Sequence, residues 1–471
     1  MNERVAPALS TATERKPVTS LRDWLDVLAA SGRLAVARPG VDLKFELAAI
    51  AKKLDGTQAT FFPHPSGHPV PVISGLTSDR GWMAEAMGVG DERLLASFQE
   101  AALNPLPWRE VSSAPVQEVV HRDVDLPRLL PIPVHNELDS GPYITAGLLV
   151  SRNPKTDAQN VTIHRLQLSG PKKLGVLLLP RHTLRFFQMA EDAGGDLPVA
   201  IVVGVDPLTL LASQAIAPLD FDELTIAGAL HGRPLDVVKC LGNDIRVPAQ
   251  AEIVLEGRIL ARVRELEGPF GEFPQYYGEP AENHVIEIDT ITHRKNPIFH
   301  TILGGGIEHL LLGGVPREAT IMAHLRRSFP GVRDVHLSRG GTCRYHLNIQ
   351  FEKRFEGEGK NVIMGAFGAH YDIKHVVVVD PDVDIHDQAQ VEWAIATRFQ
   401  ADRDLVVVSE AQGSRLDPSS RNGVSAKMGF VVTVPLNSPA MKYKRIAVPG
   451  EDKVDLAKAI DATADWRKAM K

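Results

Sequence analysis

Hydrophobic positions near the start of the chain repeat with the period of a helix. Ser20 is a favourable capping residue with Asp23 three places on, and Trp24 and Leu28 then fall on one helical face. Gly32 follows as a residue that commonly ends a helix. The pattern therefore predicts a first amphipathic helix that begins just after Ser20.

The pattern changes twice along the rest of the chain, which predicts three domains. We expect residues 1–17 to be a disordered tail and residues 18–124 to form an N-terminal α/β domain of short alternating strands and helices. The Pro-rich stretch at 125–136 predicts an extended crossing, because each proline removes a backbone donor. Strand-like runs then dominate 141–303, which predicts a barrel or sandwich within a central domain at 125–315.

The last third of the chain has an α/β pattern. Residues 316–329 predict a connector helix, and residues 330–471 predict a C-terminal α/β domain with a helical tail. A strand-like run, a helical run and a second strand-like run follow one another, and this order predicts a parallel pair with a right-handed crossover. Their sequences are KHVVVVDPDVD, VEWAIATRFQ and RDLVVVSEAQ.

Composition narrows the class of protein. The 471 residues include 52 Lys and Arg against 58 Asp and Glu, a net charge of −6, so a generally basic nucleic-acid-binding surface is excluded. Two cysteines are too few for a disulfide scaffold or a four-cysteine zinc site. We find no signal-peptide pattern and no apolar run of membrane-spanning length, so we expect a cytoplasmic protein without a membrane span.

Most local motifs do not predict a site. The glycine runs Gly304–Gly306 and Gly340–Gly341 lack dinucleotide-binding spacing. The aspartates at 380, 382 and 384 imitate a calcium loop, but Ile385 stands where its glycine should be, which favours a polar strand end. Cys240 lies in an apolar run and is expected to be a buried, inert thiol.

One local group of residues could support acid–base catalysis. Glu267 and Glu272 flank a Gly-Pro-Phe-Gly segment that must turn, and Glu265 lies nearby. A turn can direct two carboxylates into one cleft, where their pKa values are pushed apart so that one acts as an acid. Taken alone, the same residues are also typical of a solvated acidic turn, and the pattern by itself favours that simpler interpretation.

Longer blocks of sequence resemble a known family. The run from Val237 to Gly257, followed by EGPFGE at 267–272, is similar to the UbiD family, which includes 3-polyprenyl-4-hydroxybenzoate and ferulic acid decarboxylases. Further matching blocks extend the resemblance over most of the chain, namely DLPRLLPIPVHN, the segment 160–165, VVVVDPDVDI, WAIATR and SAKMG.

The resemblance implies a fold and a cofactor. Members bind prenylated FMN in a split β-barrel domain, so we expect an α+β and α/β multidomain protein with a central split barrel. A divalent metal, Mn²⁺ or Mg²⁺, links protein to cofactor phosphate, with K⁺ as a further cation. The matching metal ligands would be Asn160, His182 and Glu223, a hard-to-borderline set that suits these ions. The expected cofactor contacts are Asn160, Val161, Thr162, Ile163, His164, Arg165, Arg181, His182 and Glu223.

The resemblance also implies the catalytic residues. Arg165, Glu267 and Glu272 match the arginine and the two glutamates of the family. An arginine fork can hold a carboxylate through two parallel hydrogen bonds, and Glu272 can deliver a proton where CO₂ departs. Three positions differ from the family pattern. Thr162 and His164 replace residues that are often Gly and Tyr, and Gly368 aligns near a phosphate-contacting basic residue.

The sequence therefore predicts a reversible, non-oxidative decarboxylase of an aromatic, heteroaromatic or α,β-unsaturated acid. Its partners would be that acid, CO₂ and a flavin prenyltransferase as cofactor supplier, with no nucleic acid, in a homodimer or hexamer. Two alternatives stay open. One is the 3-polyprenyl-4-hydroxybenzoate decarboxylase of ubiquinone biosynthesis, and the other is a non-catalytic flavin-binding accessory subunit.

Overall fold

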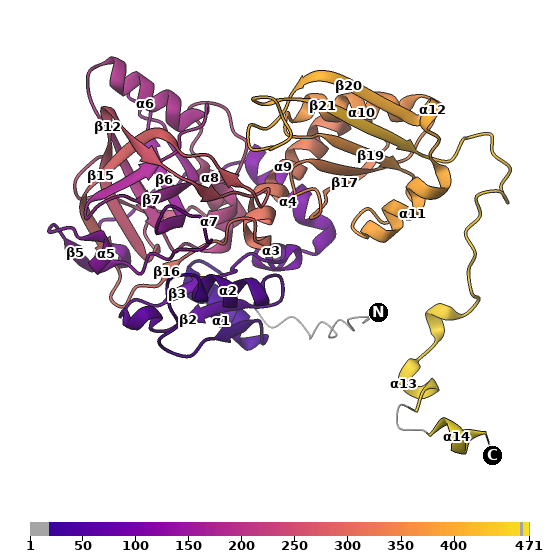
Figure 1. The fold of residues 1–471 in the computed structure, drawn as a ribbon, viewed down its shortest axis with the longest axis horizontal. Helices are drawn as coiled ribbons and strands as arrows, with labels where there is room; N and C mark the ends of the chain where they lie inside the picture. Colours follow the sequence, from indigo (N-terminus) through magenta and orange to yellow (C-terminus); the bar gives the residue numbers. More distant parts are fainter. Residues whose placement is uncertain (1–17, 462–464, 471) are drawn as a thin grey trace.

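The computed structural model describes residues 18–461 and 465–470, so the expected tail at 1–17 lies outside the described residues. Three bodies are visible in Figure 1: an N-terminal domain, a central barrel and a C-terminal sheet, with helix α9 between the last two. Within the described residues, no helix is both long and apolar enough to cross a bilayer.

The N-terminal domain begins with the predicted helix. Ser20 caps α1 by accepting a hydrogen bond from the backbone of Asp23, and Trp24 and Leu28 are fully buried. A four-stranded sheet of order β1-β2-β3-β16 packs beside the helices, its last strand returning from the central region. The elements are α1 (Leu21–Ala30), β1 (Leu34–Val36), α2 (Glu46–Leu54), β2 (Ala59–Phe62), β3 (Val72–Ser74), α3 (Arg80–Ala86), α4 (Leu94–Leu103) and β16 (Phe299–His300).

Strand pairing assigns residues 109–121 to the central region, although we expected the N-terminal domain to extend to residue 124. Strand β4 (Arg109–Glu110) pairs with β10 (Asp236–Lys239), and β5 (Val119–His121) pairs with β15 (Ala281–His293). The Pro-rich stretch that follows is also not wholly extended. It contains the one-turn helix α5 (Leu126–Leu129), because a proline at a helix start loses no hydrogen bond.

The central region is a closed antiparallel barrel, as expected. Its sheet has the order β12-β9-β6-β7-β8-β15-β5, and β12 also pairs with β15, so that all strands but β5 form a ring. Apolar side chains from every strand of the ring fill its interior. The ring strands are β6 (Tyr143–Arg152), β7 (Gln159–Leu168), β8 (Lys173–Val176), β9 (Leu197–Val203), β12 (Ile253–Glu267) and β15.

Short elements complete the central region around the barrel. Helix α6 packs its phenylalanines against the barrel interior, and α7 and α8 pack on its outside. A small hairpin carries the turn after β12. These elements are α6 (His182–Asp192), α7 (Pro207–Ala212), α8 (Glu223–Leu230), β11 (Arg246–Pro248), β13 (Phe270–Gly271) and β14 (Tyr277–Gly278).

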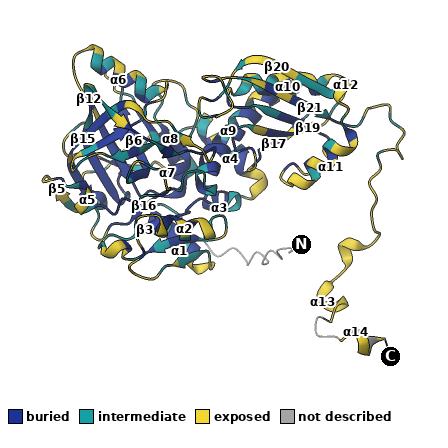
Figure 2. Cartoon of the chain, in the orientation of Figure 1, coloured by how far each residue is buried: buried dark blue, intermediate teal, exposed yellow. Residues whose placement is uncertain are grey.

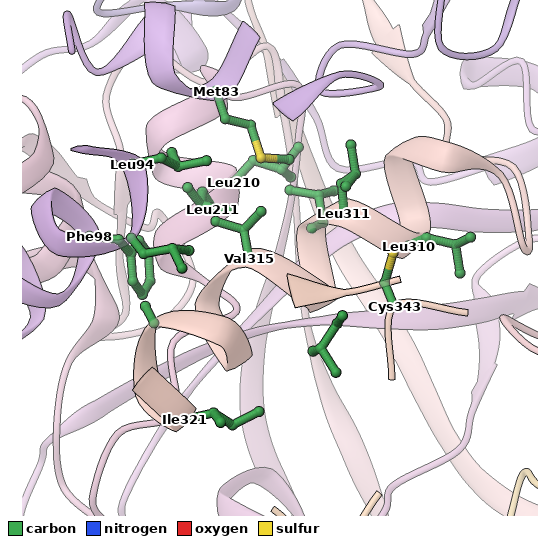
Figure 3. Close-up of a cluster of buried hydrophobic side chains, with 14 of the residues drawn as sticks. Met83, Leu94, Phe98, Leu210, Leu211, Leu310, Leu311, Val315, Ile321 and Cys343 are labelled. Carbon is green, nitrogen blue, oxygen red and sulfur yellow. The ribbon is translucent and has the colours of Figure 1, made fainter. Parts of the chain in front are cut away.

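The predicted connector helix begins too late. Helix α9 runs from Ile307 to Ser328, so Gly313, Gly314 and Pro316 lie inside it rather than before it. Tertiary packing explains this, because Cys343 and Arg344 lie directly against the two glycines, where a side chain would not fit. Figure 3 shows α9 residues packed with side chains from α3, α4 and α7 in one apolar cluster.

The C-terminal domain contains a five-stranded sheet of order β17-β18-β19-β21-β20. The predicted parallel pair of β19 and β20 is wrong, since β21 lies between them and β20 is antiparallel to it at the sheet edge. The elements are β17 (Val332–Leu337), β18 (His346–Phe351), α10 (Glu358–Ala369), β19 (His375–Val379), α11 (Gln388–Arg398), α12 (Ala401–Asp404), β20 (Leu405–Gln412), β21 (Val424–Val432), α13 (Leu456–Ala459) and α14 (Trp466–Ala469).

Helix α9 also joins the N-terminal and C-terminal domains through a buried carboxylate. Glu318 forms an ion pair with Arg80 of α3, and its Oε1 lies 3.0 Å from Nδ1 of His336 on β17. Burial disfavours the charged form, but Arg80 and His336 together lower the pKa of Glu318 to about 2. A buried carboxylate with two such partners holds three elements in one relative position.

The glycines of α9 give a test of this packing. Replacing Gly313 by Ala places a methyl group in the position of the Arg344 guanidinium. We expect the free energy of unfolding to fall by about 1–3 kcal/mol, as for overpacked cores, measured by urea denaturation. Gly368→Ala is the matched control, because its position in α10 is open and alanine favours a helix by about 1 kcal/mol. Equal losses in both variants would contradict the packing argument.

Candidate active site

The predicted catalytic residues meet at one end of the barrel. Arg165 on β7 donates from Nε to Oε1 of Glu267 at 3.0 Å and from Nη2 to Oε2 at 2.8 Å. This is the two-bond fork that a guanidinium forms with a carboxylate. The third nitrogen, Nη1, donates to Oε1 of Glu272. One arginine therefore holds both glutamates of the turn.

Glu267 lies at the end of β12 and is 1% exposed. Asn283 Nδ2 donates to its Oε2 at 2.9 Å, and the Tyr143 hydroxyl donates to its Oε1 at 3.2 Å. Gly175 on β8 makes room for it, because a Cβ there would lie 3.2 Å from Cγ of Glu267. Every hydrogen-bond partner of this carboxylate is therefore a donor, and together they fix its orientation.

Glu272 follows strand β13 on the turn and is 9% exposed. Burial raises the pKa of its carboxyl group above the ordinary range, against the opposing effect of Arg165. The raised pKa suits a group that holds a proton until it is needed. Glu265, by contrast, is paired at the surface with Nζ of Lys173 at 2.6 Å, so it does not enter the site.

The predicted metal ligands also converge. Nδ1 of His182 lies 3.0 Å from Oδ1 of Asn160, and Oε2 of Glu223 accepts a hydrogen bond from the backbone of Val161 at 2.7 Å. Arg181 points elsewhere, donating to the hydroxyl of Tyr371 at 3.0 Å. His182 therefore has the better placement for a ligand than Arg181.

The surroundings of Glu223 would favour a bound cation. It is 4% exposed, and burial raises the pKa of its carboxyl group to about 8. A metal ion would supply the positive charge that favours its ionised form. Among the described residues, no three His, Cys, Asp or Glu side chains are grouped for a metal, so the amide of Asn160 is needed to complete this set.

The remaining predicted contacts on β7 point to two faces. Val161 packs outward with the cluster around α8, and Ile163 packs against the same cluster. Thr162 and His164 lie on the opposite face, opposite Leu149 and Gly147 of β6. Burial lowers the pKa of His164 to about 4, which keeps its ring neutral. The polar residues that depart from the family pattern therefore share the face whose other residues fill the barrel.

Three cations lie beyond the catalytic turn, and the sequence patterns did not reveal them. We call Arg317, Arg344 and Lys427 the cation cluster. Asp372 is a carboxylate that acts on all three, so the cluster has three positive charges against that one negative charge. Nε of Arg317 is buried without a hydrogen-bond partner and lies 4.0 Å from Asp372. Burial and the charge of Arg344 lower the pKa of Arg317 to about 9.

The cation cluster adjoins the catalytic turn directly. The ring of Phe273, the residue after Glu272, lies 5.1 Å from the Arg344 guanidinium and 6.3 Å from the ring of His309. Burial lowers the pKa of His309 to about 3. On its other side, the cluster faces the charge of Arg181, the neighbour of a predicted metal ligand. Buried cations are costly unless they meet an anion, so this site is built for anionic groups.

Lys427 is a buried basic residue of the C-terminal domain that belongs to the cation cluster. Gly368 has open space around it in α10. Lys427 is 4% exposed and donates to the carbonyl oxygens of Tyr371 and Ile373, both at 2.8 Å. It stands in the SAKMG block that resembles the family, but nothing in that pattern marked it as a site residue. Cys240 is buried at the start of a loop, away from these residues, and burial raises the pKa of its thiol.

Comparison with known proteins gives a consistent result. Three domains of 3-octaprenyl-4-hydroxybenzoate carboxy-lyase match the chain: the N-terminal domain over residues 25–102, the Rift-related domain over 109–307 and the C-terminal domain over 310–432. Anhydromevalonate phosphate decarboxylase of Methanothermobacter thermautotrophicus is 39% identical over 428 residues, 91% of this chain and 99% of that protein.

Solved structures give the same family. The UbiD-class enzyme HmfF from Pelotomaculum thermopropionicum, in complex with FMN, is 50% identical with a TM-score of 0.92, and the match covers 94% of this chain and 100% of that one. An evolved dimeric form of the same enzyme, in complex with prenylated FMN, is 47% identical with a TM-score of 0.89, again covering 94% and 100%.

Proposed function

The chain belongs to the UbiD family and is a carboxy-lyase, and from this premise we propose that it decarboxylates an unsaturated acid bearing a second anionic group, with prenylated FMN as cofactor. The proposal rests on the position of Arg165, which donates hydrogen bonds to the buried carboxylates of both Glu267 and Glu272. A non-catalytic accessory subunit would not require these three side chains to lie together.

Asn160, His182 and Glu223 would hold a Mn²⁺ or Mg²⁺ ion, with K⁺ as a further cation, and a flavin prenyltransferase would supply the cofactor. The residues fit such a group, because a buried carboxylate of raised pKa stands beside an amide oxygen and an imidazole. Prenylated FMN, when bound, supplies an electron sink for the pair left after CO₂ departs, which no side chain provides.

The protein's own side chains orient the substrate acid and deliver a proton to it. Arg165 lies beside the reacting group and orients Glu267 through two parallel hydrogen bonds. Burial raises the pKa of the Glu272 carboxyl group, which favours the protonated form of this side chain. Glu272 delivers the proton to the carbon that has lost CO₂. In the reverse direction the same carboxylate removes that proton.

The cation cluster indicates the class of acid. Arg317 has a buried Nε without a hydrogen-bond partner, and the three positive charges of the cluster exceed the single negative charge of Asp372. A cofactor phosphate accounts for one anion, and a second carboxylate or a phosphate on the substrate would account for another. The relatives named for anhydromevalonate phosphate act on a compound whose name includes such a group. The ubiquinone-pathway alternative fits these cations less well, because a polyprenyl tail is apolar and cannot pair with them.

The metal set is tested by two neighbouring residues. We expect His182→Ala to lose bound metal and flavin, because it removes an imidazole beside Asn160. Arg181→Ala should keep the metal, since its guanidinium points to Tyr371. Metal content by mass spectrometry and the flavin spectrum of the purified holoenzyme measure both. Metal loss in Arg181→Ala alone would reverse the assignment.

Proton delivery is tested by Glu272→Gln, which keeps the shape of the side chain. Turnover should fall by at least about 100-fold, as is usual for a lost general acid, while flavin and metal stay bound. Glu265→Gln is the control, since that carboxylate pairs with Lys173 at the surface. In the wild type, kcat should fall as pH rises through the raised pKa of Glu272, because the acid form is then lost. Wild-type turnover in Glu272→Gln would assign the acid elsewhere.

The substrate class is tested with pairs of unsaturated acids that differ only in a second carboxylate or phosphate. Wild type should favour the dianion in kcat/KM. Arg317→Gln should lower kcat/KM for the dianion by about 10–100-fold, the value of a hydrogen bond to a charged group, and change the monoanion little. Arg327→Gln, exposed on the same helix, is the control. Equal kcat/KM for both acids in the wild type would refute the proposal that the substrate carries a second anionic group.

A further inference from the structure

A small cavity lies where the N-terminal domain meets the start of helix α9. Its walls come from α2, from β3 and from the loop that leads into α9, and Figure 2 shows β3 in the dark blue of buried residues. The cavity has a volume of about 10 Å³, which is close to the space that one water molecule or one small ion needs. Three side chains that carry oxygen line it, namely Asp55, Ser78 and Glu308.

Two carboxyl groups line the cavity from different elements. Asp55 follows the last turn of α2, and its Oδ2 accepts a hydrogen bond from the backbone of Ile307 at 2.7 Å. Glu308 is 2% exposed, and its oxygens accept hydrogen bonds from the backbones of Gly75 at 2.8 Å and Thr77 at 3.2 Å. These contacts hold both carboxyl groups in place around the cavity.

Little positive charge faces these two carboxyl groups. Among the described residues, neither Asp55 nor Glu308 forms an ion pair with a lysine or an arginine, and the ring of His300 lies 3.3 Å from Glu308. Burial is the largest effect on the pKa of Asp55 and raises it, and the charge of Glu308 raises it further. The smallest effect comes from Arg339, which lowers that pKa. Neighbouring carboxylates away from water are costly without a matching cation, so a positive charge between them would offset that cost.

Ser78 supplies a third oxygen at the cavity. Its side chain is fully buried, and its Oγ has no hydrogen-bond partner. The hydroxyl nevertheless lies near enough to Asp55 to lower the pKa of that carboxyl group. A buried hydroxyl without a partner costs free energy, and a particle in the cavity that its oxygen coordinates would remove that cost.

We propose that the cavity binds a small monovalent cation of the size of Na⁺, held by oxygens of Asp55, Ser78 and Glu308. Carboxylate oxygens suit hard cations, but Ca²⁺ takes about six to eight oxygen ligands and Mg²⁺ keeps several of its waters, so both need more room than this cavity has. A water molecule would satisfy Ser78 and leave the two carboxyl groups without a balancing charge. The site shares no residue with the proposed metal ligands of the cofactor.

A bound ion here supports the catalytic turn. Leu303 and Gly306, at the two ends of one short loop, form part of the cavity wall. Gly304 of that loop packs directly against the backbone of Gly271, and a Cβ at Gly305 would lie 3.5 Å from the carbonyl oxygen of Glu272. The ion therefore joins α2 of the N-terminal domain to the loop that contacts the turn of the active site.

Direct binding is tested with the flavin-loaded holoenzyme, dialysed against radioactive Na⁺ in choline chloride. The wild type should bind one more sodium ion for each chain than Ser78→Ala or Asp55→Asn. The asparagine keeps an oxygen that can accept from Ile307 and removes only the charge. Thr292→Val is the matched control, because it removes another buried hydroxyl without a partner, on β15. This control should keep the wild-type count, and the same count in Ser78→Ala as in the wild type would overturn the proposal.

Stability distinguishes a bound cation from a bound water. The unfolding midpoint of the wild type should be at least about 2 °C higher in sodium chloride than in choline chloride of equal ionic strength, because a ligand of the folded state stabilises it. Ser78→Ala should lose this difference between the salts, whereas Thr292→Val should keep it. If the cavity holds only water, Ser78→Ala removes an unpartnered hydroxyl, is neutral or stabilising in both salts and keeps the wild-type difference between them. That result would also overturn the proposal.

Discussion

Closure of the barrel between β12 and β15 is the constraint from which the active site follows. Strand β12 pairs with β9 only as far as Ile259, and beyond a register shift it continues with β15 alone to Glu267. This second half of β12 ends at Glu267, which there contacts Arg165 on β7. Asn283, near the start of β15, then lies within hydrogen-bond distance of the same carboxylate. The long pairing of these two strands therefore delivers two of the contacts that orient Glu267.

Small residues let the charged groups approach one another. Gly175 leaves space for Glu267, and a Cβ at Gly278 would lie 3.3 Å from Nη1 of Arg165. Arg165 and Glu267 are both nearly buried, and an unpaired charge there would be very costly. Pairing through two parallel bonds offsets that cost and fixes the geometry before any substrate arrives. Glu272 differs from this pair in position, because it lies on a turn rather than a strand and contacts Arg165 through one nitrogen only.

Helix α9 unites the three domains and carries charge into the interior. Its apolar face packs with residues of α3, α4 and α7, while Glu318 pairs with Arg80 and Arg317 enters the cation cluster. The adjacent residues Arg317 and Glu318 of this helix therefore have different roles. Glu318 is satisfied by partners from two domains, whereas Arg317 has a buried nitrogen without one. The first arrangement stabilises the assembly of domains, and the second is suited to a ligand.

The sequence by itself determined the features that depend on local pattern. Period and capping predicted α1, strand-like runs predicted the barrel strands, and the blocks that resemble the UbiD family predicted Arg165, Glu267 and Glu272. Tertiary structure decided what depends on distant partners. Helix α9 includes Gly313 because Arg344 packs against it, and β20 takes the sheet edge because β21, later in the chain, pairs with β19. The cation cluster joins Arg317, Arg344 and Lys427, which lie 27 and 83 positions apart along the chain, so no local pattern brings them together. Burial in the folded protein lowers the pKa of each of these basic side chains.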